Sequence, residues 1–265
     1  MAKTKKRLTV TDFVKMKSNG EKITMLTAYD YSTARMLDDS GVDMLLVGDS
    51  LAMVVQGHEN TIPVSLDEMI YHGEMVARAA RRSFVVVDIP FPVNHHGVHE
   101  AVKAAGRIMK ETGCQAVKLE GGADQADVIR AMVNAGIPVI AHVGLRPQAV
   151  HAMGGYKVQR DRDELMTDAT AAQEAGAFCV LIECVPAEIA AELSEKLRVP
   201  TIGIGAGVGC DGQVLVINDM LGMTSGYVPS FVKAYANLQQ QITNAVTQWC
   251  GDVKEKKFPD ADHSF

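Results

Sequence analysis

Short apolar runs alternate with helix-like stretches along almost the entire chain, and this alternation constrains the fold more than any other feature. The runs are rich in Val, Ile and Leu and are mostly continuous, which is typical of strands buried on both faces of a sheet. The seven clearest lie at residues 23–27, 44–47, 84–87, 116–119, 137–141, 178–182 and 200–204. An eighth strand is expected at 214–217, although 221–224 also has strand composition.

The stretches between the runs carry helix signals. Ser65 is followed three residues later by Glu68, which is the capping-box pattern that begins a helix. Thr11 is expected to cap a short first helix that reaches residue 17. The other helices are expected at 32–40, 65–80, 99–112, 124–135, 163–175 and 186–197, with one or two more within 231–250.

Strands that alternate with helices throughout predict a parallel sheet with right-handed crossovers. Seven or eight such units in 265 residues favour a (β/α)8 TIM barrel, which typically has about 250 residues. An open, doubly wound sheet would be expected to carry G-x-G-x-x-G after its first strand. The glycine-rich segment 203–208 lacks the final glycine and follows the seventh run. We therefore predict one α/β barrel domain over residues 1–265, with a short N-terminal helix and C-terminal helices.

Four of the predicted strands end in an acidic side chain. These are Asp49, Asp88, Glu120 and Glu183. The C-terminal ends of the strands surround the active site of a (β/α)8 barrel, so we expect the four carboxylates to converge there. Any one of them could instead cap a helix or form a surface ion pair, but four together favour a site. Lys118 shares a strand face with Glu120, because side chains alternate along a strand, and should point into the same barrel mouth.

Carboxylates that cluster in this way repel one another unless a cation lies among them. Oxygen ligands without a soft ligand nearby favour Mg²⁺ over zinc, and Mg²⁺ often completes its coordination with substrate oxygens. The substrate is then expected to be a chelating oxyacid. Ser50 can donate a hydrogen bond to the carboxylate of such an acid, and Lys118 supplies positive charge for it. His142 ends the fifth strand and could either contact the substrate or support a neighbouring side chain.

Three other features have alternative interpretations. His95, His96 and His99 superficially resemble a zinc site, but no cysteine or carboxylate stands at ligand spacing, which favours loop histidines. The glycine run at 203–209 could bind phosphate through backbone N–H groups, although a tight turn is favoured because no basic residue accompanies it. The loop at 154–160 could be a mobile lid or an ordinary flexible loop.

The bulk properties of the chain exclude several classes of protein. A net charge of −6 gives no reason to expect nucleic acid, and the basic residues 3–7 are expected to form a solvated tail. No secretory signal follows that segment, and no apolar run approaches the roughly 18 residues that a membrane span requires. The five cysteines form no C-x-x-C pair, which favours reduced thiols in a cytoplasmic protein over a disulfide framework or a zinc cluster.

Seven motifs, in order along the chain, connect it with a known family. They are TAYDY at 27–31, VGDSL at 47–51, VQGH at 55–58, VKLEGG at 117–122, GGYKVQ at 154–159, ECVP at 183–186 and GIGAG at 203–207. With them the chain resembles the 3-methyl-2-oxobutanoate (ketopantoate) hydroxymethyltransferase family over nearly its whole length. Arg160, where the family usually has glycine, and the apolar character of 208–210 depart from the pattern, both in loops.

The resemblance implies a barrel of the phosphoenolpyruvate-mutase/isocitrate-lyase type and one Mg²⁺ per subunit, held by Asp49, Asp88 and Glu120. It implies that Asp49, Ser50, Asp88 and Lys118 bind a 2-oxo acid and that Glu183 is the base. The implied reaction transfers a hydroxymethyl group from 5,10-methylenetetrahydrofolate to 3-methyl-2-oxobutanoate through a Mg-stabilised enolate. The product is 2-dehydropantoate, on the route to pantothenate and coenzyme A, and family members are commonly homodecamers of two pentameric rings.

Two other functions compete with this interpretation. A Mg²⁺-dependent C–C or P–C lyase of a related barrel would also act on a 2-oxo acid. Such lyases generally need a catalytic cysteine or another acid in a mobile loop, and Cys210 is the one cysteine expected in a loop of that kind. A binding protein without activity would be expected to lack one of the strand-end carboxylates, and all four are present.

Overall fold

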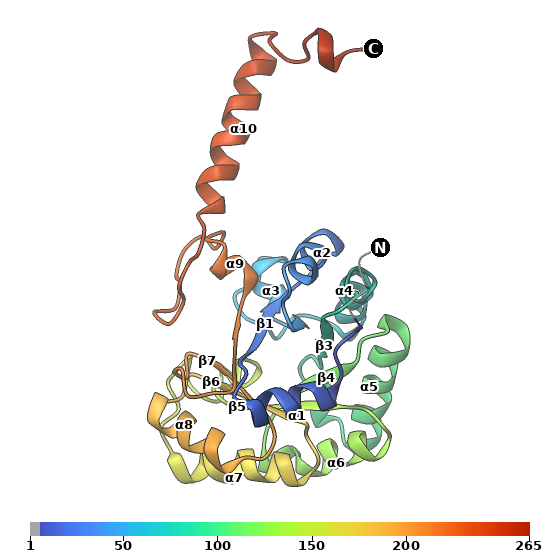
Figure 1. Ribbon diagram of the computed structural model, residues 1–265, viewed down its shortest axis with the longest axis vertical. Coiled ribbons are helices and arrows are strands. Elements are labelled where there is room, and N and C mark those ends of the chain that lie inside the picture. Colours follow the sequence, from blue (N-terminus) through green and yellow to red (C-terminus); the bar gives the residue numbers. More distant parts are fainter. Residues whose placement is uncertain (1–5) are drawn as a thin grey trace. The chain divides into compact units, whose positions relative to one another are not determined.

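Eight parallel strands form a closed barrel in chain order, with the eighth strand paired to the first (Figure 1). The structure is a computed structural model that describes residues 6–265. It confirms the predicted (β/α)8 barrel. Of the predicted basic tail at 3–7, residues 3–5 lie outside the described part of the chain. The strands are β1 (Ile23–Thr27), β2 (Met44–Val47), β3 (Phe84–Asp88), β4 (Ala116–Glu120), β5 (Val139–Gly144), β6 (Cys179–Glu183), β7 (Thr201–Ile204) and β8 (Gly212–Leu215).

Helices surround the barrel, and consecutive helices from α4 to α8 pack against one another. The predicted helices are present, with ends shifted by a few residues, and the short helix after β2 was not expected. The helices are α1 (Val10–Asn19), α2 (Tyr31–Asp39), α3 (Leu51–Val54), α4 (Leu66–Ala79), α5 (Val98–Thr112), α6 (Ala126–Asn134), α7 (Arg162–Glu174), α8 (Ala187–Lys196), α9 (Ile217–Met220) and α10 (Leu238–Lys254).

Two local predictions were wrong. The first helix begins at Val10 with Thr9 as its N-cap rather than Thr11, because the Thr9 backbone N–H and hydroxyl both donate to the Asp12 carboxylate. The eighth strand begins at Gly212, two residues before the predicted start, and pairs with β7 and β1. The alternative segment 221–224 is not a strand.

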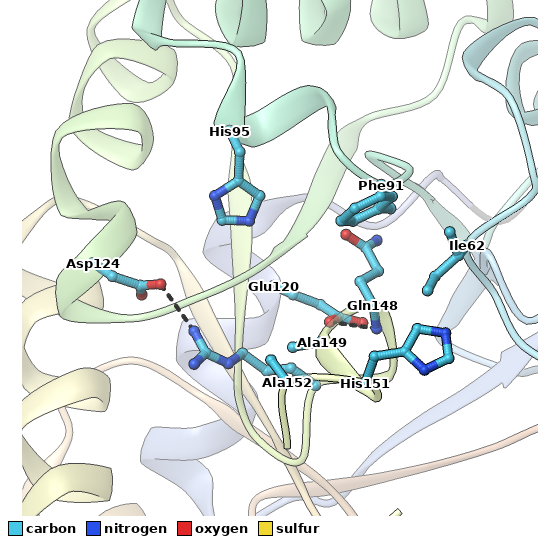
Figure 2. A pocket seen from close by; sticks show the side chains of 10 residues that line it. Ile62, Phe91, His95, Glu120, Asp124, Gln148, Ala149, His151 and Ala152 are labelled. Carbon is cyan, nitrogen blue, oxygen red and sulfur yellow. Dashed lines mark hydrogen bonds and ion pairs between the residues drawn. The ribbon is translucent and has the colours of Figure 1, made fainter. Parts of the chain in front are cut away.

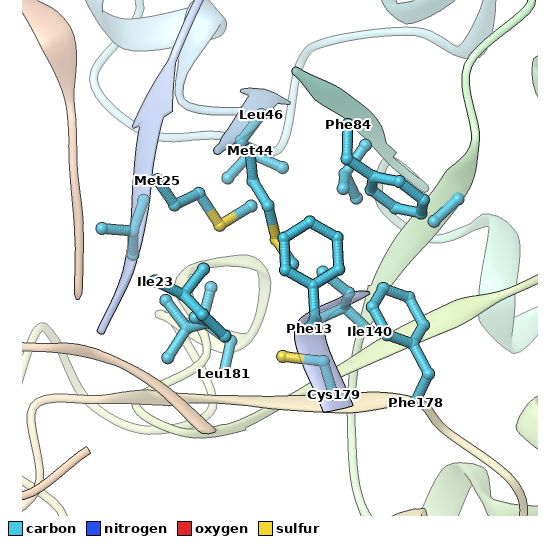
Figure 3. Packing of buried hydrophobic residues seen from close by; sticks show 14 residues of the cluster. Phe13, Ile23, Met25, Met44, Leu46, Phe84, Ile140, Phe178, Cys179 and Leu181 are labelled. Carbon is cyan, nitrogen blue, oxygen red and sulfur yellow. The ribbon is translucent and has the colours of Figure 1, made fainter. Parts of the chain in front are cut away.

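The core at the N-terminal end of the barrel is closed by α1 (Figure 3). Phe13 of α1 is fully buried and meets the Phe84 ring edge-on, with ring centroids 5.3 Å apart. Phe84 in turn lies 5.7 Å from Phe178, centroid to centroid. Aromatic residues therefore fill this end of the barrel, and the charged strand ends are left at the opposite end.

Replacing Ser65 with alanine is expected to lower the free energy of unfolding by about 1 kcal/mol, because the N-cap of α4 is lost. The Ser65 hydroxyl accepts from the Glu68 backbone N–H at 3.3 Å, and the Glu68 carboxylate accepts from the Ser65 backbone N–H at 2.7 Å. The Glu68 carboxylate also accepts from the Ser65 hydroxyl at 2.7 Å, and its two bonds from Ser65 lower the pKa of Glu68. Denaturant unfolding measures the effect, and Ser18→Ala is the control. Among the hydrogen bonds of the described residues, the exposed Ser18 hydroxyl makes only one, within α1, to the Val14 carbonyl. Equal losses in the two variants would contradict the cap.

The chain divides into two compact units, Met1–Val216 with the barrel and Ile217–Phe265 with α9 and α10. The single domain expected over residues 1–265 stays a prediction. In the second unit, α10 has no buried residue. Among residues 6–265, none of the helices has the length and apolar character needed to cross a membrane.

Candidate active site

Three of the predicted acidic residues and Lys118 meet at the C-terminal ends of β2, β3 and β4. The Asp49 backbone N–H donates to Asp88 Oδ2 at 3.0 Å, and Lys118 Nζ lies 3.0 Å from Asp88 Oδ1. The parallel register explains the second contact, because it pairs Asp88 of β3 directly with Lys118 of β4. Each of these side chains is at most 5% exposed, as is Glu120 at the end of β4. The cluster predicted from the strand ends is therefore formed and buried.

Gln148 connects two of these carboxylates and was missed in the sequence. Its side-chain amide donates to Asp49 Oδ2 at 2.8 Å and to the Ile89 carbonyl at 3.0 Å, and its backbone N–H donates to Glu120 Oε2 at 3.0 Å. Gln148 lies in a single 3₁₀ turn (Pro147–Ala149) that follows β5. A proline after a predicted strand indicates such a turn, but nothing local shows that the next residue will hold two acids.

Ser50 lies beside the carboxylates and is held by a tyrosine. Its hydroxyl is 2.8 Å from the hydroxyl of Tyr29, a buried residue of the loop after β1. Burial raises the pKa of Tyr29, so the phenol stays protonated and can donate to Ser50. The Ser50 hydroxyl is then free to donate to an acidic group in the barrel mouth, as its predicted role requires.

Glu183 ends β6, and the backbone around it is tightly constrained. Its carbonyl accepts from the Leu145 backbone N–H at 2.9 Å. A Cβ atom on Gly144, which has a φ of +89°, would lie 2.4 Å from the same carbonyl oxygen, so only glycine fits there. Cys184, the next residue, has a φ of 49°, an unusual conformation for a residue with a side chain. The carboxylate is 16% exposed, and burial raises its pKa to about 7 against the opposing charge of Lys118.

His142 lies in β5, two residues before the end of the strand, and its ring lies between Lys118 and Glu183. Its Nδ1 is 3.2 Å from Lys118 Nζ, and its Nε2 is 3.2 Å from Glu183 Oε2. Nδ1 is also 3.9 Å from Glu120 Oε1, beyond hydrogen-bond distance. The side chain is 3% exposed, and burial together with the nearby Lys118 charge holds its pKa well below the ordinary value. The imidazole is therefore neutral.

The buried charges of the site shift one another's pKa. Burial raises the pKa of Asp88 to about 7, and it raises that of Asp49 and, more strongly, that of Glu120. Lys118 opposes the shift in all three. Burial by itself would lower the pKa of Lys118, but the Asp88 and Asp49 carboxylates reverse this and raise it. The lysine therefore stays charged and holds the cluster together.

The donor set fits a hard divalent cation. Glu120 Oε1 is a buried oxygen without a hydrogen-bond partner among the described residues, a costly state that a cation would relieve, and Asp88 Oδ1 has only its ion pair with Lys118 at 3.0 Å. All the candidate ligand atoms are oxygens, which suits Mg²⁺. Across residues 6–265 no group of three or more His, Cys, Asp or Glu side chains is arranged so that these side chains could hold a metal ion. Mg²⁺ is compatible with this arrangement, because it usually keeps waters and takes oxygens from a substrate.

A pocket of about 340 Å³ opens beside Glu120 and Gln148 (Figure 2). Its wall includes the apolar side chains of Ile62 and Phe91 and the basic side chain of Arg146, whose guanidinium lies 2.9 Å from Asp124 Oδ2. The volume lies within the range of small-molecule sites, about 300–1,000 Å³. The pocket adjoins the carboxylate cluster, because Glu120 and Gln148 belong to both.

The structure also places the histidines, the glycine run and the loop that each had two interpretations. His95 lines the pocket and lies 3.2 Å from the Gln125 amide through Nδ1, whereas the His99 side chain is 92% exposed. Cβ atoms on Gly207 and Gly209 would lie within 2.7 Å of Ala187 and Ala191 Cβ atoms of α8, so this glycine run is needed for close packing. The loop at 154–160 is joined to the end of β6 by a backbone hydrogen bond from residue 159 to the Cys184 carbonyl.

The fold of this chain is shared with several solved structures. A phosphonopyruvate hydrolase in complex with oxalate and Mg²⁺ matches with a TM-score of 0.63 at 12% identity, over 96% of this chain and 92% of that one. A 2,3-dimethylmalate lyase, described as a member of the PEP mutase/isocitrate lyase superfamily, matches with a TM-score of 0.60 at 17% identity, over 97% and 91%. These likenesses show that the chain shares the barrel fold of those proteins, as predicted.

Sequence comparison identifies the family of this chain. The ketopantoate hydroxymethyltransferase family matches residues 7–261. The 3-methyl-2-oxobutanoate hydroxymethyltransferase of Rhodopirellula baltica is 55% identical over 263 residues, which cover 99% of this chain and 98% of that protein. The enzyme of the same name from Syntrophotalea carbinolica is 54% identical over 264 residues, 98% and 99% of the two chains. The chain belongs to the ketopantoate hydroxymethyltransferase family, which confirms the resemblance seen in its motifs.

Proposed function

We propose that this protein is a folate-dependent hydroxymethyltransferase that converts 3-methyl-2-oxobutanoate into 2-dehydropantoate, with 5,10-methylenetetrahydrofolate as the one-carbon donor. Family membership supports the reaction. We assign the roles from one observation: the charged side chains at the mouth of the barrel form two separate groups. Asp49, Asp88 and Glu120 gather around Lys118, whereas Glu183 stands on β6 and contacts His142.

Asp49, Asp88 and Glu120 would hold Mg²⁺, and the buried oxygens Glu120 Oε1 and Asp88 Oδ1 support this for two of the three residues. When bound, Mg²⁺ would supply Lewis-acid polarisation of the 2-oxo group. Lys118 and the Ser50 hydroxyl would hold the carboxylate of the substrate. Asp49 and Asp88 would lie beside the bound 2-oxo acid. In this arrangement the C3–H of the substrate is directed toward the strand end of β6. His142 was predicted to bind substrate, and this remains a proposal.

Glu183 is the proposed base and removes the C3 proton. The enolate carbon forms the new C–C bond with the methylene carbon of the folate. One water gives its oxygen to that carbon and its two protons to the two folate nitrogens as both C–N bonds break, which releases tetrahydrofolate. The proton held by Glu183 passes to the oxygen of the new hydroxyl group and restores the carboxylate. A carboxylate with a pKa near the working pH is suited to this step, because it is ionised and still basic.

The pocket beside Glu120 is the proposed place of the folate. It adjoins the carboxylate cluster, and Phe91 and Ile62 give it an apolar wall that could pack against a flat heterocycle. Arg146, fixed by Asp124, could meet a polar edge of the same ring. The donor's methylene carbon would then face the enolate.

Removal of divalent metal is expected to abolish product formation. The purified protein should form 2-dehydropantoate from the two substrates, EDTA should stop the reaction, and excess Mg²⁺ should restore it. Mass spectrometry of the product measures each step. Product formed at an unchanged rate in EDTA would contradict the metal assignment, and absence of product with Mg²⁺ present would contradict the function.

The rate of deuterium exchange at C3 is expected to rise with pH and to level off above about pH 7. The sign follows from the role of Glu183: its pKa is raised to about 7, and only the ionised form accepts a proton. Below that value the rate should change about tenfold per pH unit. NMR follows the exchange without folate, at saturating Mg²⁺ so that titration of the metal ligands does not intervene. A rate that is flat from about pH 5.5 to 8.5 would exclude Glu183 as the group that titrates.

The competing lyase is less well supported. Cys210, which that mechanism would need in a mobile loop, is fully buried. Its pKa is raised by burial, which disfavours the reactive thiolate. A binding protein without activity is disfavoured as well, because the four acidic strand ends remain together in one mouth.

We propose that the protein is a homo-oligomer, a decamer of two pentameric rings. Within α10, four apolar residues recur at a spacing of four, three and four residues and remain 41–55% exposed: Ile242, Val246, Trp249 and Val253. Such a stripe is suited to packing between subunits. Light scattering coupled to gel filtration measures the mass. The five cysteines are free thiols, which supports the proposed cytoplasmic location.

A further inference from the structure

The contacts of His142 determine which of its ring nitrogens carries the proton. Lys118 Nζ lies 3.2 Å from Nδ1, and an ammonium group offers only donors. Lys118 is kept charged by Asp88 Oδ1 at 3.0 Å. Nδ1 must therefore accept, and in a neutral imidazole the proton is then on Nε2. That nitrogen faces Glu183 Oε2 at 3.2 Å.

We propose that His142 is a positioning residue for Glu183: its Nε2–H donates to Glu183 Oε2, while Lys118 holds the ring through Nδ1. This inference rests on the proposed function, in which Glu183 is the base. The Nε2–Oε2 contact is close but not yet aligned as a full hydrogen bond. Contacts of this kind commonly tighten when substrate binds.

The arrangement assigns the proton transfer to one oxygen. With Oε2 occupied by the imidazole N–H, the other oxygen of Glu183, Oε1, is the one that receives the C3 proton. Lys118, which we assign to the substrate's carboxylate, is thereby connected to the base through a single ring. The backbone at Glu183 is already constrained by Gly144 and by the positive φ of Cys184, so His142 supplies the remaining restraint, on the side chain.

The role differs from the substrate contact predicted for His142 from the sequence, and kinetics separates the two. In the C3 exchange reaction, His142→Ala is expected to lower kcat by roughly 10–100-fold, because misplacement of a reacting group by about 1 Å costs that much. KM for the 2-oxo acid should change little. His142→Gln, whose amide N–H can reach a similar position, should recover most of the rate. A raised KM with retained kcat would overturn the inference in favour of the substrate contact.

A second measurement does not depend on activity. Neutron diffraction from deuterated crystals of the metal-free wild-type protein should show a deuteron on His142 Nε2 and none on Nδ1. A deuteron on Nδ1 would overturn the inference and leave the proposed function untouched. Absence of C3 exchange in the wild-type enzyme would instead contradict the role of Glu183 as the base, and His142 would then have no base to position. The neutron experiment needs no variant, so poor folding of His142→Ala does not affect it.

Discussion

Glu183→Gln is expected to slow deuterium exchange at C3 of 3-methyl-2-oxobutanoate by about 10²–10⁴-fold, the usual contribution of a positioned general base. Glutamine has nearly the same shape but cannot accept the proton. The carboxylate is partly ionised at neutral pH in the wild type, because its pKa is raised to about 7. Exchange is measured by NMR with Mg²⁺ and without folate, so that the proton abstraction is observed separately from C–C bond formation.

Glu188→Gln is the matched control, because Glu188 is exposed in the first turn of α8, five residues further along the chain. It should exchange at the wild-type rate. Calorimetric titration with Mg²⁺ should give similar affinities for both variants and the wild type, since Glu183 is not among the proposed ligands. Exchange that survives in Glu183→Gln would assign the base to another group, and lost Mg²⁺ binding would place Glu183 among the metal ligands.

Lys118→Met is expected to lower the free energy of unfolding of the metal-free protein by about 3–5 kcal/mol at about pH 8, because it leaves a buried carboxylate cluster without its cation. The lysine is 4% exposed and lies 3.0 Å from Asp88. Without its charge, the pKa of Asp88, already about 7, should rise further, and so should those of Asp49 and Glu120.

The pH dependence of this loss has a definite sign. A carboxyl whose pKa is higher in the folded than in the unfolded state binds more protons when folded, so stability falls as pH rises through the interval between the two values. The deficit of Lys118→Met should therefore be smaller at about pH 6 than at about pH 8. Mg²⁺ should restore part of the stability by binding the folded state.

Lys103→Met is the control for this loss, since Lys103 is 63% exposed and pairs with Glu100 on the surface of α5. Exposed pairs of this kind contribute about 0–1 kcal/mol. Denaturant unfolding at one fixed protein concentration compares the variants. If Lys118→Met and Lys103→Met unfold at the same denaturant concentration at both pH values, the cluster does not depend on Lys118.

The positions of Asp49, Asp88, Glu120 and Glu183 at one barrel mouth could be predicted, because each ends an apolar run and the C-terminal ends of parallel strands lie on one side. Gln148 could not be predicted. It is 99 residues from Asp49 and 28 from Glu120, and only the turn after β5 brings it to both. The N-cap of α1 was missed for a smaller reason: Thr9 and Thr11 both suit the position, and the choice depended on the reach of Asp12.

The sequence by itself determined that this chain forms a (β/α)8 barrel with acidic strand ends, because local runs and their spacing encode which segments are buried on both faces. Only the tertiary structure decided which of these acidic side chains lie near Lys118 and which one contacts His142. The register of the strands sets Lys118 beside Asp88, and the end of β5 brings His142 to Glu183. Burial then shifts the pKa of each of these groups. The distances between the side chains and their burial cannot be predicted from adjacent residues, because both depend on residues that are far apart in the sequence.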